Sequence, residues 1–148
     1  KVYRGLVSRE ESKKKIFSWL YNPNSNDYLA SHYYDRKKIK SKYWNGEEIE
    51  TIFNRQILSD EFHSVNYIIQ STCAENVLRQ MIKVADHLKG SKSFIAFPVH
   101  DSIVIDMALE DIKRVPNLVE LFGDTELGKF LVNVSAGKTF GTLQKVEI

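Results

Sequence analysis

The fold is decided by the stretch Ser93-Phe-Ile-Ala-Phe-Pro-Val-His-Asp-Ser-Ile-Val-Ile-Asp-Met107. Two β-rich apolar runs, Ser93 to Val99 and Ile103 to Met107, flank His100 and Asp101. This pattern predicts an antiparallel hairpin with the His-Asp pair at its tip. A carboxylate at such a tip can hold Mg²⁺ through one oxygen and leave room for phosphate and water. An aspartate that only closes a turn is the alternative.

The segment before the hairpin has helical spacing. Apolar residues recur every three or four positions from Ala74 to Leu88, and Gly90 ends the pattern. Thr72 followed by Glu75 is a capping box, so we expect the helix to start there. A long amphipathic helix beside a hairpin predicts an α+β fold, with helices packed on one face of a small antiparallel sheet.

The rest of the chain predicts shorter elements of both kinds. They are a helix from the Ser8 capping box to Asn22, a polar helical segment from Asp27 to Lys42, a turn at Trp44-Asn45-Gly46, a strand or short hairpin from Glu48 to Ile57, a helix from Leu109 to Phe122 interrupted by Pro116, and a strand from Phe130 to Val134.

Composition restricts the class of protein. The chain has 148 residues, 43% of them hydrophobic, which suffices for one domain or a large piece of one. No apolar run approaches the roughly 20 residues of a membrane span, so we expect no membrane partner. Cys73 is the only cysteine. It excludes a disulfide within the chain, favours a reducing compartment, and is expected to be a packed core thiol.

Charge is distributed unevenly along the chain. The net charge is +2, yet residues 1–42 contain eleven Lys or Arg against four Asp or Glu, a net of +7, which leaves −5 for the remainder. A basic half and an acidic half suggest one surface for polyanions and another for metal ions or a partner. A solvated charged face is the alternative.

Four residues of the first expected helix are spaced four apart, namely Arg9, Lys13, Phe17 and Tyr21. This spacing places two cations and two rings on one slowly drifting helical stripe. Arg9 and Lys13 are about 6 Å apart along the axis, which matches neighbouring phosphates. The rings could stack on a sugar and a base. A solvated cationic helix is the alternative.

Together these segments resemble family A DNA polymerases, the DNA polymerase I-like group. Arg9 to Tyr21 matches the fingers-helix pattern Arg-x3-Lys-x3-Phe-x3-Tyr, and Val99-His100-Asp101 resembles motif C, Val-His-Asp-Glu. Asn66 to Glu75 resembles the helix start Asn-x3-Gln-Gly-Thr-Ala-Ala-Asp, and Val132 to Gly141 resembles the C-terminal Val-x-Val-x-x-Gly-Lys-x-Trp-Gly. Thr51 to Arg55 is a weaker match to a Thr-x-x-Gly-Arg hairpin. The blocks occur in order and span nearly the whole chain.

The resemblance implies a fold and a reaction. Residues 1–60 would be part of the fingers subdomain, and residues 61–148 the C-terminal part of the palm. The reaction would be template-directed transfer of a nucleotide from a dNTP to a primer 3′-hydroxyl by a two-metal mechanism. The implied cofactor is Mg²⁺, the partners are primer–template DNA and a dNTP, and the location is the cytoplasm of a bacterial or phage-infected cell.

The resemblance also implies roles at the first helix. Arg9 and Lys13 match residues that hold the incoming triphosphate, and the Lys13 match also serves as general acid toward pyrophosphate. Phe17 matches the position beside the nucleotide sugar. Tyr21 matches the position that stacks at the templating pair.

Four further residues match DNA-contacting blocks, namely Arg55, Asn66, Gln70 and Thr72. Asn66 and Gln70 match residues that touch the minor groove. Hydrogen-bond acceptors there are placed alike in all correct base pairs, so amide donors test the shape of a pair rather than its sequence.

The hairpin tip supplies the implied catalytic centre. His100 matches a residue near the primer end, and Asp101 matches one of two metal-binding aspartates. The other belongs to motif A, which has no match before Ser8, so we expect a C-terminal fragment that needs an upstream region or a companion polypeptide. Ser102 replaces the motif's Glu, and Pro98 replaces a Gln. A catalytically degenerate DNA- or nucleotide-binding module, or a basic α+β protein with chance matches, are the alternatives.

Overall fold

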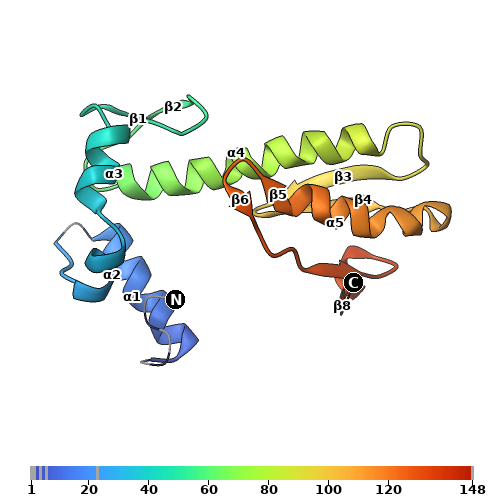
Figure 1. Cartoon of the computed structure of the whole chain (residues 1–148), viewed down its shortest axis with the longest axis horizontal. Coiled ribbons are helices and arrows are strands. Elements are labelled where there is room, and N and C mark those ends of the chain that lie inside the picture. The colour runs from blue at the N-terminus through green and yellow to red at the C-terminus, as the bar shows by residue number, and fades with distance from the viewer. Residues whose placement is uncertain (1–2, 4, 6, 23, 148) are drawn as a thin grey trace. The chain divides into compact units, whose positions relative to one another are not determined.

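The structure is a computed structural model that describes Tyr3, Gly5, residues 7–22 and residues 24–147. It divides into an N-terminal unit, Lys1–Thr72, and a C-terminal unit, Cys73–Ile148. Figure 1 shows the mixture of helices and small antiparallel sheets that makes the fold α+β, as predicted. Within the described residues, no helix combines the length and apolar character needed to cross a membrane.

Helix α1 (Arg9–Tyr21) begins where the sequence predicts. The Ser8 hydroxyl accepts from the Glu11 amide at 3.2 Å, and the Glu11 carboxylate accepts from the Ser8 amide at 3.0 Å. This reciprocal pair satisfies two amides that a helix otherwise leaves unbonded. The helix ends at Asn22, whose extended backbone cannot continue it.

The segment from Asp27 to Lys42 forms two short helices, α2 (Tyr28–Tyr33) and α3 (Arg36–Tyr43). An aspartate begins each one, because the Asp27 carboxylate accepts from the Ala30 amide at 2.8 Å and the Asp35 carboxylate from the Lys38 amide at 2.9 Å. The helical prediction is confirmed, with a break at Tyr34 and Asp35.

Arg36, the first residue of α3, contacts the end of α1. Its guanidinium lies 4.6 Å from the centroid of the Trp19 ring and donates to the carbonyls of Trp19, Asn22 and Ser25. Burial lowers the pKa of Arg36, which nevertheless stays charged at neutral pH. Trp19 itself is buried, so this contact closes one side of the core of the N-terminal unit.

A short hairpin follows α3. The predicted turn is confirmed, with Gly46 at φ +112° and the Asn45 side chain accepting from two following amides. Strands β1 (Glu48–Glu50) and β2 (Gln56–Leu58) then pair antiparallel. Between them the buried Thr51 hydroxyl accepts from the Arg55 amide at 3.1 Å.

Helix α4 (Ser64–His87) starts well before the predicted capping box. The Asp60 carboxylate accepts from the His63 amide at 2.9 Å at its beginning. Thr72 therefore lies inside the helix, and among the described residues its hydroxyl has no hydrogen-bond partner. The predicted start was wrong because Val65 and Ile68 are buried and extend the apolar face of the helix upstream.

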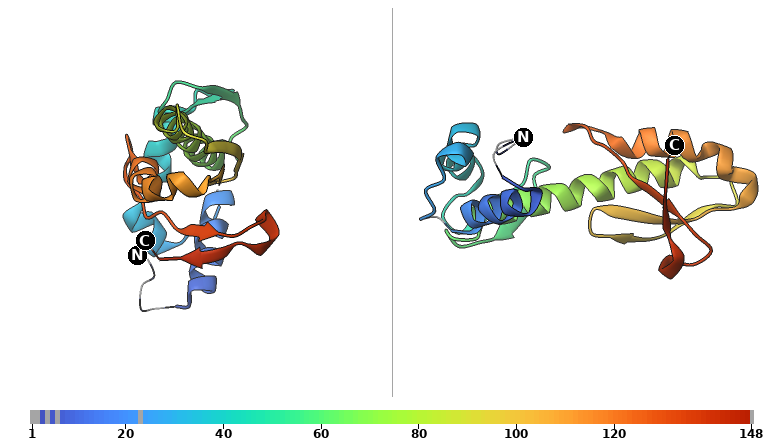
Figure 2. Two further views of the ribbon diagram at one scale, coloured as in Figure 1. Left: turned by 90° about the vertical axis from the view of Figure 1, so that its right-hand side faces the viewer. Right: turned by 90° about the horizontal axis from the view of Figure 1, so that it is seen from below.

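The hairpin that decided the fold is confirmed in the C-terminal unit. Strands β3 (Phe94–Val99) and β4 (Ser102–Asp106) pair antiparallel, with a bulge between Ile95 and Phe97. The two-residue turn between them is His100 and Asp101. Figures 1 and 2 show the hairpin and α5 (Val115–Gly123) lying along the C-terminal part of α4.

Apolar side chains from these three elements form the core of the C-terminal unit. Val84 of α4, Leu88 just after its end and Leu118 of α5 are buried, and Ile95 and Ile103 of the hairpin pack against them. The core therefore holds one face of the two-stranded sheet against helices, the packing that the sequence predicts.

The region of the predicted helix from Leu109 to Phe122 contains a 3₁₀ turn, η1 (Leu109–Arg114), followed by α5. Pro116 lies in the first turn of α5, where a missing amide proton costs nothing. Pro116 thus marks where α5 begins.

The predicted strand from Phe130 to Val134 was wrong. Short strands β5 (Asp124–Thr125) and β6 (Gly128–Lys129) precede this segment, and strands β7 (Val134–Ala136) and β8 (Gln144–Val146), joined by the turn η2 (Phe140–Thr142), form the end of the chain. The Phe130 amide donates to the Gly123 carbonyl at 2.9 Å, in the register of the β5–β6 pair, and residues 130–133 form no strand. A Cβ on Gly123 would lie 2.8 Å from the Phe130 carbonyl oxygen, so this close approach requires glycine.

Cys73 is exposed, which corrects its prediction as a core thiol.

Candidate functional site

The stripe on α1 is presented to solvent. Arg9 and Lys13 are exposed, and the side chains of Phe17 and Tyr21 are 51% and 47% exposed. The two rings lie 6.1 Å apart between centroids, tilted by 58°. Lys13 is 3.9 Å from Glu10, an exposed contact that contributes little and leaves the ammonium able to change partners.

Tyr21 connects α1 to the first turns of α4. The Gln70 amide donates to the Tyr21 hydroxyl at 2.9 Å, although the two residues are 49 positions apart in the chain. Tyr21 and Gln70 belong to two blocks that were identified separately in the sequence, and the structure brings them together within the N-terminal unit.

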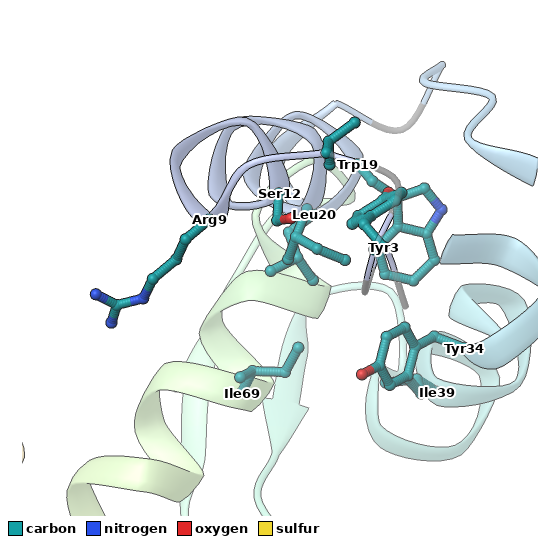
Figure 3. Close-up of a pocket in the computed structure, with 11 residues that line it drawn as sticks. Tyr3, Arg9, Ser12, Trp19, Leu20, Tyr34, Ile39 and Ile69 are labelled. Atoms are coloured by element: carbon teal, nitrogen blue, oxygen red, sulfur yellow. The ribbon is translucent and has the colours of Figure 1, made fainter. Parts of the chain in front are cut away.

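A cavity of about 670 Å³ lies beside α1. Its walls are mainly apolar side chains of the N-terminal unit, including Trp19 and Leu20 of α1, Ile39 of α3 and Ile69 of α4. Figure 3 shows Arg9 projecting away from the Tyr3 and Trp19 rings at one end of this cavity.

Tyr3 is the most perturbed tyrosine of this region. Its side chain is 3% exposed, and among the described residues its hydroxyl has no hydrogen-bond partner of normal geometry. Burial first, and the adjacent Asp27 carboxylate second, raise the pKa of Tyr3 to about 12. The phenol is therefore protonated at neutral pH, and it lines the cavity as a neutral group.

The other candidate DNA-contacting residues have different environments. Asn66 is buried near the start of α4, with 6% of its surface exposed, and Thr72 is half-buried further along the helix. Arg55 is exposed immediately after the β1–β2 turn. Asn54, where the matching pattern has glycine, adopts φ +66°.

The hairpin tip carries His100 and Asp101, both exposed. His100 has φ +50°, a conformation uncommon for residues other than glycine, and the Ser102 hydroxyl donates to the Val99 carbonyl at 2.8 Å. In the part of the chain that the structure describes, no group of three or more His, Cys, Asp or Glu side chains could hold a metal ion. Asp101 thus offers one carboxylate.

Sequence reasoning missed a residue that positions the hairpin, Asp111 of η1. This nearly buried carboxylate accepts from the Ser93 hydroxyl at 2.8 Å and from the Ser93 and Lys92 amides at 3.1 Å. It ties η1 to the start of β3. No local pattern marks it, because its partners lie 18 and 19 positions earlier in the chain.

The arrangement suits two kinds of chemistry. The α1 stripe offers two exposed cations and two rings for a polyphosphate and its nucleoside, and the hairpin tip offers one carboxylate for a cation. Neither a protein-family model, nor a curated protein, nor a solved structure matches the chain.

Proposed function

We propose that this chain forms the fingers and the C-terminal palm of a template-directed DNA polymerase of family A, which transfers a nucleotide from a dNTP to a primer 3′-hydroxyl. The hydrogen bond from Gln70 to Tyr21 is the observation that supports this proposal best. It joins a nucleotide-binding block and a DNA-binding block of the resembling family across 49 positions of sequence. A chance match of either block alone gives no reason for such a contact.

The backbone of two further blocks agrees with the proposal. Asn54 has a positive φ where the family pattern has glycine, and asparagine is among the non-glycine residues that adopt this conformation most readily. His100 and Asp101 form a two-residue turn between antiparallel strands, as the motif C resemblance implies.

In this proposal, Arg9 and Lys13 bind the triphosphate and Lys13 protonates the leaving pyrophosphate. Phe17 and Tyr21 lie along the sugar and the new base pair. The described residues do not by themselves fit a two-metal site, because no group of three or more His, Cys, Asp or Glu side chains among them could hold a metal ion. The proposal assigns the other acidic ligand to an upstream region or a companion polypeptide.

One observation favours a second function, a DNA- or nucleotide-binding module without catalysis. Ser102 stands where motif C has glutamate, and its hydroxyl donates back to the Val99 carbonyl. It therefore places no negative charge beside Asp101. Such a module would use the same α1 stripe for binding, and would not extend a primer.

The first experiment tests the α1 stripe. Calorimetric titration of the chain with a dNTP should give an affinity that Arg9→Ala and Lys13→Ala each weaken about 10-fold or more, because each loses a charge-assisted hydrogen bond of roughly 1.5–3 kcal/mol. Lys14→Ala is the matched control, since Lys14 is also exposed on α1 but lies off the stripe. Equal losses in all three variants would show general attraction of anions and would refute the assignment.

The second experiment separates the two functions. Primer extension is measured with the chain alone and with a polypeptide that supplies the second carboxylate. Extension only by the pair, abolished by Asp101→Asn while dNTP affinity is retained, is expected for the polymerase. Binding of a dNTP without any extension by the pair would favour the non-catalytic module.

A further inference from the structure

The surface of α2 and α3 is unusually rich in exposed rings. Four of the seven tyrosines of the chain lie between residues 28 and 43. Tyr28 is 81% exposed, Tyr33 61% and Tyr34 48%. Single exposed apolar residues are ordinary, but several large rings together on one short segment indicate a surface that contacts something else.

Tyr28 and Tyr33, together with His32 between them in the chain, form what we call the aromatic platform. The Tyr28 and His32 rings are stacked, with centroids 6.4 Å apart and planes 22° from parallel. The Tyr33 ring meets His32 edge-on at 5.4 Å. The platform is therefore a continuous series of exposed rings.

The platform rests on a helix that is held in place. On α2, Ala30 is fully buried, and the Trp19 indole donates to the Ser31 hydroxyl at 3.2 Å. The Asp27 cap fixes the start of the helix. The exposed rings thus belong to a helix that is packed on its other side, so binding to them requires little further ordering of the backbone.

Cations lie close to the platform along the chain. Residues 28–43 contain five Lys or Arg and one acid, Asp35, a net of +4. Lys37, Lys38 and Lys42 are exposed, and within the described residues no carboxylate lies at ion-pair distance from them. Lys37 is four positions after Tyr33, so their Cα atoms are at most about 14 Å apart.

We propose that the aromatic platform, with Lys37, Lys38 and Lys42, binds single-stranded nucleic acid. Unpaired bases stack on exposed rings while lysines meet the backbone phosphates, the combination by which proteins bind single strands without sequence preference. A duplex keeps its bases stacked on each other and cannot use the rings in this way. The inference needs no dNTP, metal ion or companion polypeptide, so it stands or fails independently of nucleotidyl transfer.

The test measures fluorescence anisotropy of labelled 20-nucleotide single strands, one of DNA and one of RNA, titrated with the full chain. Both should bind more tightly than a DNA duplex of the same length. Tyr28→Ala and Tyr33→Ala should each weaken binding about 5-fold or more, as the loss of one stacked base predicts. Tyr28→Phe and Tyr33→Phe should retain affinity, because stacking needs the ring and not the hydroxyl.

The controls use the C-terminal unit. Phe130→Ala removes a ring that is 55% exposed outside the platform and should leave affinity unchanged. The pair Lys37→Ala and Lys38→Ala should reduce the slope of log affinity against log salt by about 1.4, whereas Lys113→Ala with Lys129→Ala should not. Any of three results would overturn the inference. They are equal binding of the duplex, unchanged affinity in both tyrosine-to-alanine variants, and competition by phosphatidylserine vesicles.

Discussion

Asp111 illustrates how one residue positions a distant part of the C-terminal unit. One carboxylate oxygen accepts from the Ser93 hydroxyl and two backbone amides, and the other lies 3.3 Å from the Arg114 guanidinium. These contacts hold the beginning of β3 beside η1. β3 leads from these contacts to the turn that carries Asp101.

This network predicts a dependence on pH. The Ser93 hydroxyl first, then the amides of Ser93 and Lys92, hold the pKa of Asp111 below its ordinary value of 3.8. A carboxyl group whose pKa is lower in the folded state stabilises the fold above the unfolded-state pKa. That contribution should be lost as the pH falls below about 4 and passes through the folded-state pKa.

Hydrogen exchange of the Ser93 amide, measured from neutral pH into the acid range, tests this expectation. After correction for intrinsic exchange, protection in the unsubstituted chain should fall more steeply in acid than in Asp111→Asn, which has no carboxyl group to titrate. Asp106→Asn, at an exposed position of β4, is the control and should retain the steep fall. Identical pH profiles for the chain and Asp111→Asn would contradict the assignment.

At the scale of elements, the hydrogen bond between Gln70 and Tyr21 links α1 to the start of α4. Both side chains are exposed, so the bond has to compete with water. Its net contribution should accordingly fall in the ordinary range for a single neutral hydrogen bond.

A double-mutant cycle measures this contribution. Tyr21→Phe combined with Gln70→Ala should show a coupling of about 0.5–1 kcal/mol in the free energy of unfolding. Urea unfolding followed by the fluorescence of Trp19 and Trp44 reports on the N-terminal unit, which contains both tryptophans. Tyr21→Phe with Gln56→Ala should show no coupling. If the Gln70 cycle is also additive, the contact does not connect the two helices.

Elements were predicted well where their signal is local. The capping box at Ser8 and the two β-rich apolar runs around His100 and Asp101 each act within a few residues, and α1 and the β3–β4 hairpin appear as expected. The start of α4 was predicted wrongly, because Thr72 and Glu75 have the spacing of a cap but the apolar face continues past them toward Ser64.

For the molecule as a whole, the main asymmetry is electrostatic. Residues 1–42 carry a net charge of +7 and the rest of the chain −5. Binding of DNA by the basic region should release counterions, so the affinity should fall as the salt concentration rises. The slope of log affinity against log salt concentration should be about −0.9 for each duplex phosphate neutralised. A slope steeper than about −2 is expected for primer–template DNA, since several exposed lysines are available. Anisotropy titrations over a range of NaCl concentrations measure it, and an affinity independent of salt would contradict it.

Features that depend on residues close together in the chain can be predicted from the amino-acid sequence alone. They include the cap of α1, the turn at Asn45 and Gly46, and the hairpin tip at His100 and Asp101. In each case a side chain or a restricted backbone acts on amides within a few positions, so the pattern alone carries the physical cause.

Contacts between residues far apart in the chain are seen first in the folded protein. The contact of Gln70 with Tyr21 spans 49 positions and that of Asp111 with Ser93 spans 18. The Phe130 amide bonds to the Gly123 carbonyl in the register of the β5–β6 pair, and on α2 Ala30 is buried while Tyr28 and Tyr33 are exposed. Such outcomes depend on the competition among many possible partners for burial and hydrogen bonds, which no single stretch of sequence contains.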